Sequence, residues 1–252
     1  MLIEVVSRTD KGRVRACNED SLALFPGAGL VTLADGMGGY SAGEVASQLA
    51  TEAVVAQLLN ECDGELAITA GQMTAAVNSA NRVVYDSSRQ VPEWQGMGTT
   101  LLLGCFQEGR VIYGHVGDSR LYRFRADHLE RLTRDHTVIQ KMVDDGFFTS
   151  YKEARAAGVN ASTLIRGLGI GVDLEVDVAV ETVEEGDLFL FCSDGLSNMV
   201  SDAAIEKVIA SSSGEMQETA AELLSLALEN GGLDNISLVL ARPEKRYMEN
   251  AG

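Results

Sequence analysis

Short runs of hydrophobic and β-branched residues recur along the chain, and most of them are bounded by Gly, Asp or Asn. Runs of this length and composition are typical of β-strands separated by turns. The segment Gln107-Glu108-Gly109 between two such runs indicates a hairpin. The pattern predicts strands over residues 3–9, 21–25, 30–34, 99–106, 110–115, 119–125, 187–192 and 235–241.

Other segments repeat their hydrophobic residues every three to four positions, which is the period of an α-helix. Helices are expected over residues 45–59, 69–89, 201–210 and 215–229. Ser41, followed three residues later by Glu44, forms a capping box that would open the first helix. The apolar stripe of that helix would consist of Val45, Leu49, Ala53 and Ala56.

The order of these elements lacks the regular strand–helix alternation of a parallel sheet. Strands come first, two helices follow, and further strands and two more helices come after them. We therefore expect an α+β fold of mostly antiparallel sheets with helices stacked outside. The chain has three prolines, no Pro- or Ser-rich linker and no solenoid-type repeat, so one domain is expected.

The polar segment 137–158 fits neither pattern. It is too long for a simple turn, and long insertions in compact domains are often lids or binding loops. A plain pair of surface helices accounts for the pattern equally well.

The charge balance narrows the class of partner. The 252 residues include 20 Lys and Arg against 37 Asp and Glu, a formal net charge of −17. This charge repels a phosphate backbone, so nucleic acid is not an expected partner, and it leaves carboxylates for hard metal ions. No apolar run approaches the roughly 20 residues that cross a bilayer, so no membrane partner is expected either.

The four cysteines lie far apart in the sequence, at Cys17, Cys62, Cys105 and Cys192. None forms a Cys-x-x-Cys pair or has a histidine at zinc-ligand spacing. Isolated cysteines are typical of a reducing compartment, and the N-terminus shows no signal-peptide pattern. A cytoplasmic protein is the expectation.

Five aspartates share one local setting: Asp20, Asp35, Asp118, Asp194 and Asp234 stand at a predicted strand end or in a turn between strands. A carboxylate there is held by the sheet while its head group faces a cleft. Each one taken singly is explained as a turn former, because Asp-Gly is a common turn dipeptide. Taken together, they would repel one another strongly unless cations lay among them.

Hard divalent ions such as Mg²⁺ or Mn²⁺ prefer oxygen ligands, whereas Zn²⁺ prefers His and Cys. Two such ions about 3.5–4 Å apart can share a water, lower its pKa and align it for in-line attack. The set of aspartates therefore predicts a metal centre that activates water.

Six short motifs, five of which contain these aspartates, follow one another along the chain. They are Arg15-Ala16-Cys17-Asn18-Glu19-Asp20, Asp35-Gly36-Met37-Gly38-Gly39, Met97-Gly98-Thr99-Thr100, Gly117-Asp118-Ser119-Arg120, Ser193-Asp194-Gly195 and Asp234-Asn235. In this order they resemble the metal-dependent protein phosphatases of type 2C, the PPM family. The resemblance covers about residues 3–241, and the Asp-Gly-Met-Gly-Gly form looks like the bacterial branch.

The resemblance implies a four-layer αββα sandwich, two antiparallel β-sheets flanked by helix pairs. It implies a single catalytic domain over residues 1–242, with a flap at about 137–162, and a short polar tail over residues 243–252. The implied activity is hydrolysis of phosphoserine and phosphothreonine in proteins, opposing a bacterial Ser/Thr kinase. We expect a monomer whose partners are phosphorylated proteins.

The resemblance also assigns metal ligands. Asp35 would bridge two Mn²⁺ or Mg²⁺ ions, and the carbonyl of Gly36 would contact one of them. Asp194 and Asp234 would bind the first ion.

The second ion would be served by Glu19 or Asp20, with Asp20 favoured. Asp118, together with Asp194, would hold a third and weaker ion.

Two further roles concern substrate. Arg15 would grip the substrate phosphate, because a guanidinium can hold two phosphate oxygens. His136, in Asp135-His136-Thr137, ranks first as general acid, with a metal-bound water as the alternative. Many bacterial members carry a histidine where Tyr40 stands, so that histidine's proton-handling role has no counterpart here.

Two other classes of function fit less well. A catalytically silent member that binds phosphoproteins would be expected to lack metal carboxylates, yet Asp35, Asp194 and Asp234 are all present. An acidic Ca²⁺-binding surface protein would be expected to carry an Asp-x-Asp-x-Asp-Gly type of loop, and the sequence has none.

Overall fold

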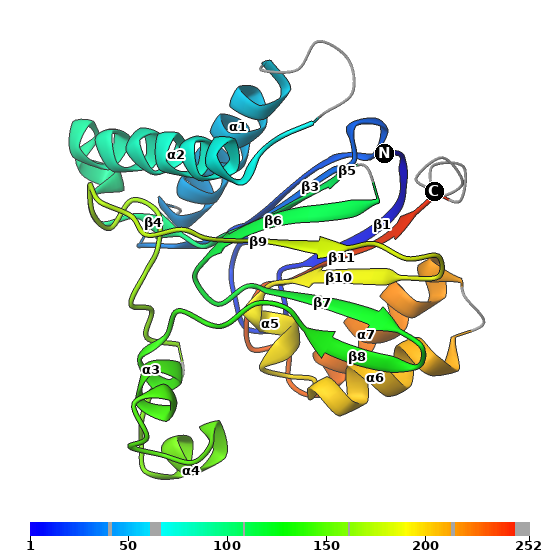
Figure 1. The fold of residues 1–252 in the computed structure, drawn as a ribbon. Coiled ribbons are helices and arrows are strands. Elements are labelled where there is room, and N and C mark those ends of the chain that lie inside the picture. Colours follow the sequence, from blue (N-terminus) through cyan, green and yellow to red (C-terminus); the bar gives the residue numbers. More distant parts are fainter. Residues whose placement is uncertain (40–41, 61–66, 108, 161, 213–214, 245–252) are drawn as a thin grey trace.

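The computed structural model describes residues 1–252 except 40–41, 61–66, 108, 161, 213–214 and 245–252. Its strands are β1 Ile3–Asp10, β2 Asp20–Phe25, β3 Leu30–Met37, β4 Gly98–Thr99, β5 Leu101–Gln107, β6 Arg110–Val116, β7 Arg120–Arg125, β8 His128–Arg131, β9 Asp177–Thr182, β10 Leu188–Cys192 and β11 Ile236–Pro243. They form two sheets that lie face to face, in the orders β1-β11-β10-β7-β8 and β2-β3-β5-β6-β9, with β4 paired to β3 (Figure 1). Every pairing is antiparallel.

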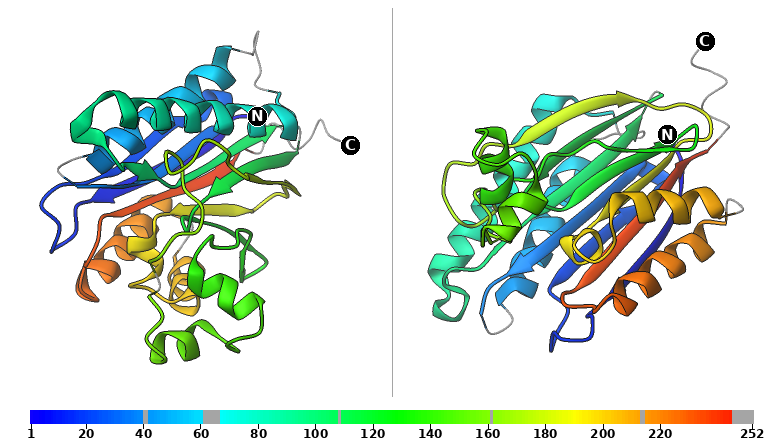
Figure 2. Two further views of the ribbon diagram at one scale, coloured as in Figure 1. Left: turned by 90° about the vertical axis from the view of Figure 1, so that its left-hand side faces the viewer. Right: turned by 90° about the horizontal axis from the view of Figure 1, so that it is seen from below.

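A helix pair covers the outer face of each sheet (Figures 1 and 2). The α-helices are α1 Ala42–Asn60, α2 Ala70–Gln90, α3 Val138–Asp144, α4 Tyr151–Ala156, α5 Asp194–Ser197, α6 Asp202–Ser211 and α7 Met216–Glu229, with two short 3₁₀ turns at Pro26–Ala28 and Pro92–Trp94. Helices α1 and α2 pack on the β2-to-β9 sheet, and α6 and α7 pack on the other. The predicted αββα sandwich and α+β class are confirmed. No helix in the described part of the chain is long and apolar enough to cross a membrane.

Strand β10 is hydrophobic along its whole length because it lies between a layer of helices and the other sheet. Leu188, Leu190 and Cys192 face the helices α6 and α7, whereas Phe189 and Phe191 face the opposite sheet. Both faces of the strand are thus buried, because side chains alternate across a strand. The same arrangement leaves the strand ends as the places where polar side chains can gather.

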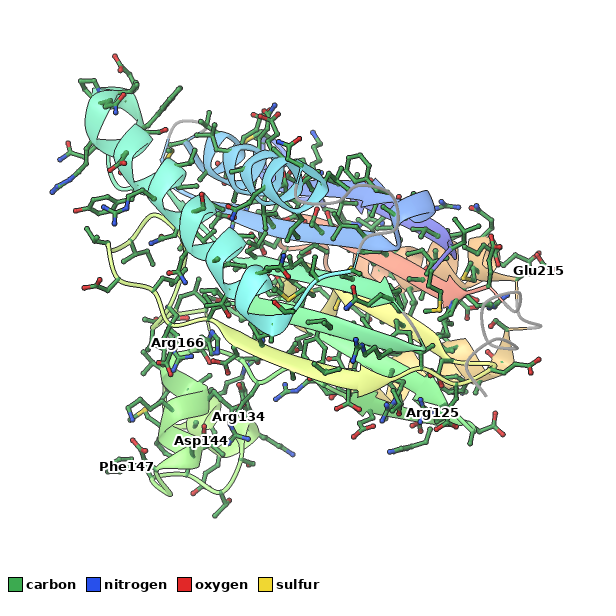
Figure 3. The ribbon with its side chains drawn as sticks, turned by 45° about the horizontal axis from the view of Figure 1, so that its top comes forward. Arg125, Arg134, Asp144, Phe147, Arg166 and Glu215 are labelled. Atoms are coloured by element: carbon green, nitrogen blue, oxygen red, sulfur yellow. The ribbon has the colours of Figure 1, made fainter. Side chains whose placement is uncertain are left out.

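The polar segment 137–158 could be either a lid or a pair of surface helices from its sequence. It contains α3 and α4, which project from the edge of the sandwich (Figure 1). We call residues 137–162 the flap. Its base is held by the Tyr151 hydroxyl, which lies 2.8 Å from Gln140 Oε1 and 3.0 Å from Asp135 Oδ2. Arg134 forms an ion pair with Asp144 along its side (Figure 3).

Two strands were missed by the sequence pattern, and one predicted strand was too long. Strands β8 and β9 are the last strands of their sheets, and both carry charged residues among the apolar ones. Charged side chains are common on edge strands, where they prevent further pairing, and they remove the hydrophobic run. The run 99–106 is divided into β4 and β5 at Thr100.

The stripe predicted for α1 was wrong. Its fully buried face contains Ala46, Ala50, Val54 and Leu58, while Val45, Leu49 and Ala53 are only partly buried and Ala56 is exposed. The helix is rich in small apolar residues, so periodicity allowed two neighbouring stripes, and contact with α2 and β3 selected between them. The proposed capping residue Ser41 and the neighbouring Tyr40 lie outside the described residues.

Candidate metal centre

Asp35 and Asp20 lie side by side because β2 and β3 pair in a register that sets them opposite each other. The backbone around Asp35 is held by the Thr99-Thr100 segment. Asp35 N donates to Thr100 Oγ1 at 3.0 Å, and Thr100 N and Thr99 Oγ1 both donate to Asp35 O at 2.9 Å. The Thr-Thr pair of the Met97-Gly98-Thr99-Thr100 motif therefore holds the backbone of β3 at Asp35.

Three further aspartates approach the same place from the other sheet and its loops. Asp118 lies between β6 and β7, Asp194 begins α5 directly after β10, and Asp234 precedes β11. A cleft of about 200 Å³ is lined by carboxylates and one arginine, namely Arg15, Glu19, Asp35, Asp118, Asp194 and Asp234. The structure therefore brings residues from distant parts of the chain into one cleft, as the motifs predicted.

Burial and mutual repulsion raise the pKa values of four of these carboxyl groups. Burial is the larger cause for Asp35, followed by the charges of the neighbouring aspartates, and its pKa lies well above the ordinary value. For the same two reasons the pKa is raised to about 7 for Asp20, about 8 for Asp118 and about 6 for Asp194. Such a group of acids is stable only with protons or cations among its oxygens.

The donor set fits hard divalent cations. Ser193 Oγ donates to Asp20 Oδ2 at 3.0 Å, but the buried Asp20 Oδ1 has no hydrogen-bond partner among the described residues. Asn198 Nδ2 donates to Asp194 Oδ2 at 2.9 Å, which orients that carboxylate. Glu19 lines the cleft, whereas Asp20 is not among its lining residues although its charge acts on Asp35.

Arg15 is the cation of this cleft. Its Nη2 donates to Asp234 Oδ2 at 2.6 Å, and 49% of its side chain is exposed. The pKa of Glu19 is raised, mainly by burial and against the lowering effect of Arg15. A guanidinium that is held on one side and open on the other can bind an incoming anion.

His136 occupies a different place from the one expected of a general acid. Gly117 N donates to its Nδ1 at 3.2 Å, which puts the ring proton on Nε2, and this atom lies 3.3 Å from Asp177 Oδ2 and 3.2 Å from Arg166 Nη1. The ring is buried and is not among the residues that line the cleft. Burial, followed by the stacked His115, lowers its pKa to about 4, so the neutral ring braces the loop that carries Asp118.

His115, His136 and Asp177 place ligand atoms within 4.8 Å of one another, away from the aspartate cleft. Arg166 Nη1 lies 2.8 Å from Asp177 Oδ1 and already supplies a positive charge there. A neutral His136 that accepts a hydrogen bond at Nδ1 carries its proton on Nε2 and has no lone pair there for a metal. The group is therefore a hydrogen-bonded support and not a second metal site.

Asn235 is the residue whose role sequence reasoning missed. Its Oδ1 accepts from Glu19 N at 2.8 Å, and its Nδ2 donates to Lys11 O at 3.0 Å and Cys17 O at 2.9 Å. One side chain thus fastens the loop carrying Arg15 and Glu19 to the strand that follows Asp234. The only available signal was the Asp-Asn pair in the last motif, which does not reveal these partners.

The glycines after Asp35 and Asp194 are required by backbone contacts. A Cβ on Gly36 would lie 2.1 Å from Gly43 O, and one on Gly195 would lie 1.9 Å from Asn235 O. The backbone of α1 and of the residue before β11 therefore approaches the two Asp-Gly pairs directly. Asp35-Gly36 lies within β3 and Asp194-Gly195 begins α5, so neither pair forms the simple turn that the dipeptide suggested.

The chain belongs to the protein phosphatase 2C family, whose family model matches residues 10–229. It is 39% identical to the serine/threonine protein phosphatase PstP of Mycobacterium tuberculosis over 241 residues, which is 96% of this chain and 45% of PstP. The chain thus spans about half the length of that relative. It is 33% identical to the serine/threonine phosphatase stp of Listeria innocua, with 96% of each protein covered.

A solved structure of the PstP catalytic domain in complex with two manganese ions has the same fold. It superposes with a TM-score of 0.84 at 38% identity, covering 96% of this chain and 98% of that one. The crystal structure of Stp1 from Staphylococcus aureus gives a TM-score of 0.86 at 29% identity, with 97% and 96% covered. The predicted family and its bacterial branch are confirmed.

The raised pKa values predict how the stability of the metal-free protein depends on pH. An Asp ionises near pH 3.9 in the unfolded chain but near pH 7 for Asp20 and pH 8 for Asp118 in the folded protein. Their protonated forms stabilise the fold fully below the unfolded pKa, and this contribution is lost as the pH rises through the folded pKa. His115 and His136, whose pKa values are lowered by burial, oppose this trend only weakly, because an unfolded histidine is already half neutral at about pH 6.5 and loses its remaining charge soon above it.

In EDTA, the melting temperature is expected to fall by about 4–8 °C between pH 6.5 and 8.5, as a loss of about 2 kcal/mol implies for a chain of this size. Calorimetry in EDTA and in Mn²⁺ would measure this. Bound cations replace the protons, so the fall should be much smaller in Mn²⁺. A melting temperature that rises with pH in EDTA would contradict the raised pKa values.

Proposed function

We propose that this protein is a metal-dependent protein serine/threonine phosphatase that hydrolyses phosphoserine and phosphothreonine. The observation that carries the proposal is the meeting of buried and half-buried aspartates, from elements of both sheets, with one half-exposed arginine in a single cleft. Membership of the protein phosphatase 2C family and the names of the relatives support it. A silent binding module is not favoured, because no carboxylate of the set is missing.

The residues divide into metal ligands and a substrate residue. Asp35 would bridge two Mn²⁺ or Mg²⁺ ions, with the Gly36 carbonyl, Asp194 and Asp234 completing the set for the first ion. When bound, the ions would supply positive charge for the phosphate and a water of lowered pKa.

The acidic pair Glu19 and Asp20 would serve the second ion, with Asp20 still favoured. The Asp20 Oδ1 atom, which has no hydrogen-bond partner among the described residues, supports that choice. Glu19 lines the cleft and would be the other ligand available to this ion. Asp118 would hold a third, weaker ion with Asp194.

Arg15 would bind the substrate phosphate with the side of its guanidinium that Asp234 leaves open. A phosphate monoester is a dianion, and a chain of net charge −17 repels it. Binding therefore depends on the guanidinium fork and on the cations. His136 would act by holding the Gly117-Asp118 loop, which leaves water as the proton donor to the leaving group.

The direct test is a phosphatase assay on a phosphothreonine peptide with and without metal. Activity is expected in Mn²⁺, a drop of at least about a hundredfold in excess EDTA, and recovery when Mn²⁺ is restored. The magnitude follows from losing both the activated water and the charge on the phosphate. Hydrolysis that persists in EDTA would exclude this mechanism.

The physiological partners would be phosphorylated proteins and a Ser/Thr kinase that acts on the same targets. We further propose a cytoplasmic location, which the isolated cysteines favour. A monomeric state is a separate proposal.

A further inference from the structure

A pocket of about 470 Å³ beside the flap is rich in positive charge, although the chain as a whole carries −17. Four of its lining residues are cations, Arg120, Arg131, Lys152 and Arg155, and one is an acid, Asp202. We call it the basic pocket. Strands β7 and β8 supply two of the cations and the flap helix α4 supplies the other two.

The four cations of the basic pocket outnumber the two carboxylates that pair with them, Asp135 and Asp202. Arg120 binds the buried Asp135 through two bonds of 3.0 and 2.6 Å, and Arg131 Nη1 lies 3.6 Å from the same carboxylate. Asp135 thus serves two guanidinium groups, and Arg120 Nη1 also forms an ion pair with Asp202 Oδ1 at 3.9 Å. The pKa of Asp135 is lowered although burial acts to raise it, because Arg120 and Arg131 outweigh burial.

The two flap cations are exposed and have no carboxylate partner in the described part of the chain. Lys152 forms no ion pair there, and Arg155 Nη2 donates to the neutral amide oxygen of Asn198 at 2.8 Å. Asp202, the acid of the pocket, is 55% exposed on its side chain and accepts from the Tyr122 hydroxyl at 2.9 Å. The pocket is therefore complementary to an anion.

The basic pocket is continuous with the metal centre. A second groove, of about 510 Å³, shares Arg155 and Asn198 with the basic pocket and shares Asp194 and Asp234 with the aspartate cleft. Asn198 links the two ends, since it donates to Asp194 at 2.9 Å and accepts from Arg155 at 2.8 Å. One asparagine side chain thus separates the flap guanidinium from a predicted metal ligand.

We propose that the basic pocket receives an anionic side chain of the substrate, a carboxylate or a second phosphate, close in sequence to the phosphoresidue being hydrolysed. This inference rests on the proposed phosphatase function and adds the class of substrate. The Asn198 side-chain amide bridges Arg155 and Asp194 through bonds of 2.8 and 2.9 Å, and an extended peptide advances about 3.3–3.6 Å per residue, so the anion would stand about two to four residues from the phosphoresidue. Carboxylate and phosphate both offer the charged oxygens that Lys and Arg bind.

The test compares phosphothreonine peptides that differ in one residue. The residue two, three or four positions before or after phosphothreonine is Ala, Glu or phosphoserine, and kcat/KM is measured in Mn²⁺. At the favoured position, we expect the Glu peptide to have a kcat/KM about threefold higher than the Ala peptide. We expect the phosphoserine peptide to exceed the Ala peptide about tenfold, because phosphoserine carries a larger negative charge than Glu. A response to phosphoserine alone would identify a phosphate site, and equal responses a general anion site; both support the proposal.

Lys152 is the residue to change, because it is exposed and makes no contact with the metal centre. Lys152→Ala should remove most of the gain from the anionic residue, and Lys152→Glu should reverse it. Hydrolysis of the Ala peptide and of p-nitrophenyl phosphate should stay unchanged. Lys141→Ala is the matched control, since Lys141 lies on the same flap, outside the basic pocket, and is paired with Asp145 at 3.0 Å.

The outcomes separate the two proposals. If the enzyme hydrolyses the Ala peptide but gains nothing from an anion at any position, the basic pocket is not a substrate site and the phosphatase function stands. If Lys141→Ala changes the ratio as much as Lys152→Ala, the effect is general electrostatics and the proposal is overturned. If no phosphopeptide is hydrolysed in Mn²⁺, the phosphatase function fails, and this inference fails with it.

Discussion

Asp35→Asn is expected to lower kcat/KM for a phosphothreonine peptide by at least about a thousandfold, because it removes the charge that would bridge two cations. Asp35 is central to the aspartate group, since the charges of Asp20, Asp118, Asp194 and Asp234 all raise its pKa. Asparagine keeps the size and leaves the Thr99-Thr100 support of the backbone in place. Steady-state kinetics in Mn²⁺ would measure the loss.

The same substitution should separate folding from metal binding. Without metal, neutralising a buried carboxyl among like charges should stabilise the protein, so the melting temperature of Asp35→Asn in EDTA should equal or exceed that of the unchanged protein. The increase that Mn²⁺ produces should be largely lost. Asp86→Asn, at an exposed position on α2, is the matched control and should change neither quantity. Turnover near the original rate in Asp35→Asn would contradict the assignment.

Asn235→Ala is expected to reduce stability by about 3–5 kcal/mol, because unpaired buried polar groups cost about 1–3 kcal/mol each. Its side chain serves Glu19 N, Lys11 O and Cys17 O, and the residue is 3% exposed. The loop that carries Arg15 would lose its anchor, so KM should rise as well. Urea unfolding at fixed Mn²⁺ concentration would measure the free energy of unfolding.

Asn230→Ala provides the comparison for this variant. Asn230 is exposed and makes one side-chain bond, from Nδ2 to Met199 O at 2.9 Å, so its removal should cost about 1 kcal/mol or less. If the two variants were equally stable, Asn235 would not be the anchor that its three bonds indicate.

The sequence was most informative where one strand's composition reflects burial on both faces. The run ending at Cys192 is hydrophobic throughout, because one face meets helices and the other meets a sheet. It was least informative at the sheet edges, where β8 and β9 need only one partner strand and can carry charges. In α1, alanines on two neighbouring stripes left the choice of buried face to the packing of α2 and β3.

The residues of the site likewise include some that the sequence pattern reveals and some that it does not. The order of the short motifs identified the family, and four of the five aspartates that they single out line one cleft, namely Asp35, Asp118, Asp194 and Asp234. Each motif is a local pattern of an acid beside Gly, Ser or Asn, which the sequence alone reveals. The partners of Asn235 and the ring contacts of His136 are set by residues more than a hundred positions away or on another strand. Local pattern carries no information on such contacts.

The sequence by itself thus determined the class of fold, the family and the acids that face the cleft, because hydrophobic period and turn residues are local properties. The tertiary structure alone decided which side chains support those acids, and it moved His136 from the cleft to the support of the Asp118 loop. It alone also placed flap cations beside Arg120 and Arg131. Charges from separate elements become a pocket only when folding brings them within a few ångströms, where electrostatic interactions are strong.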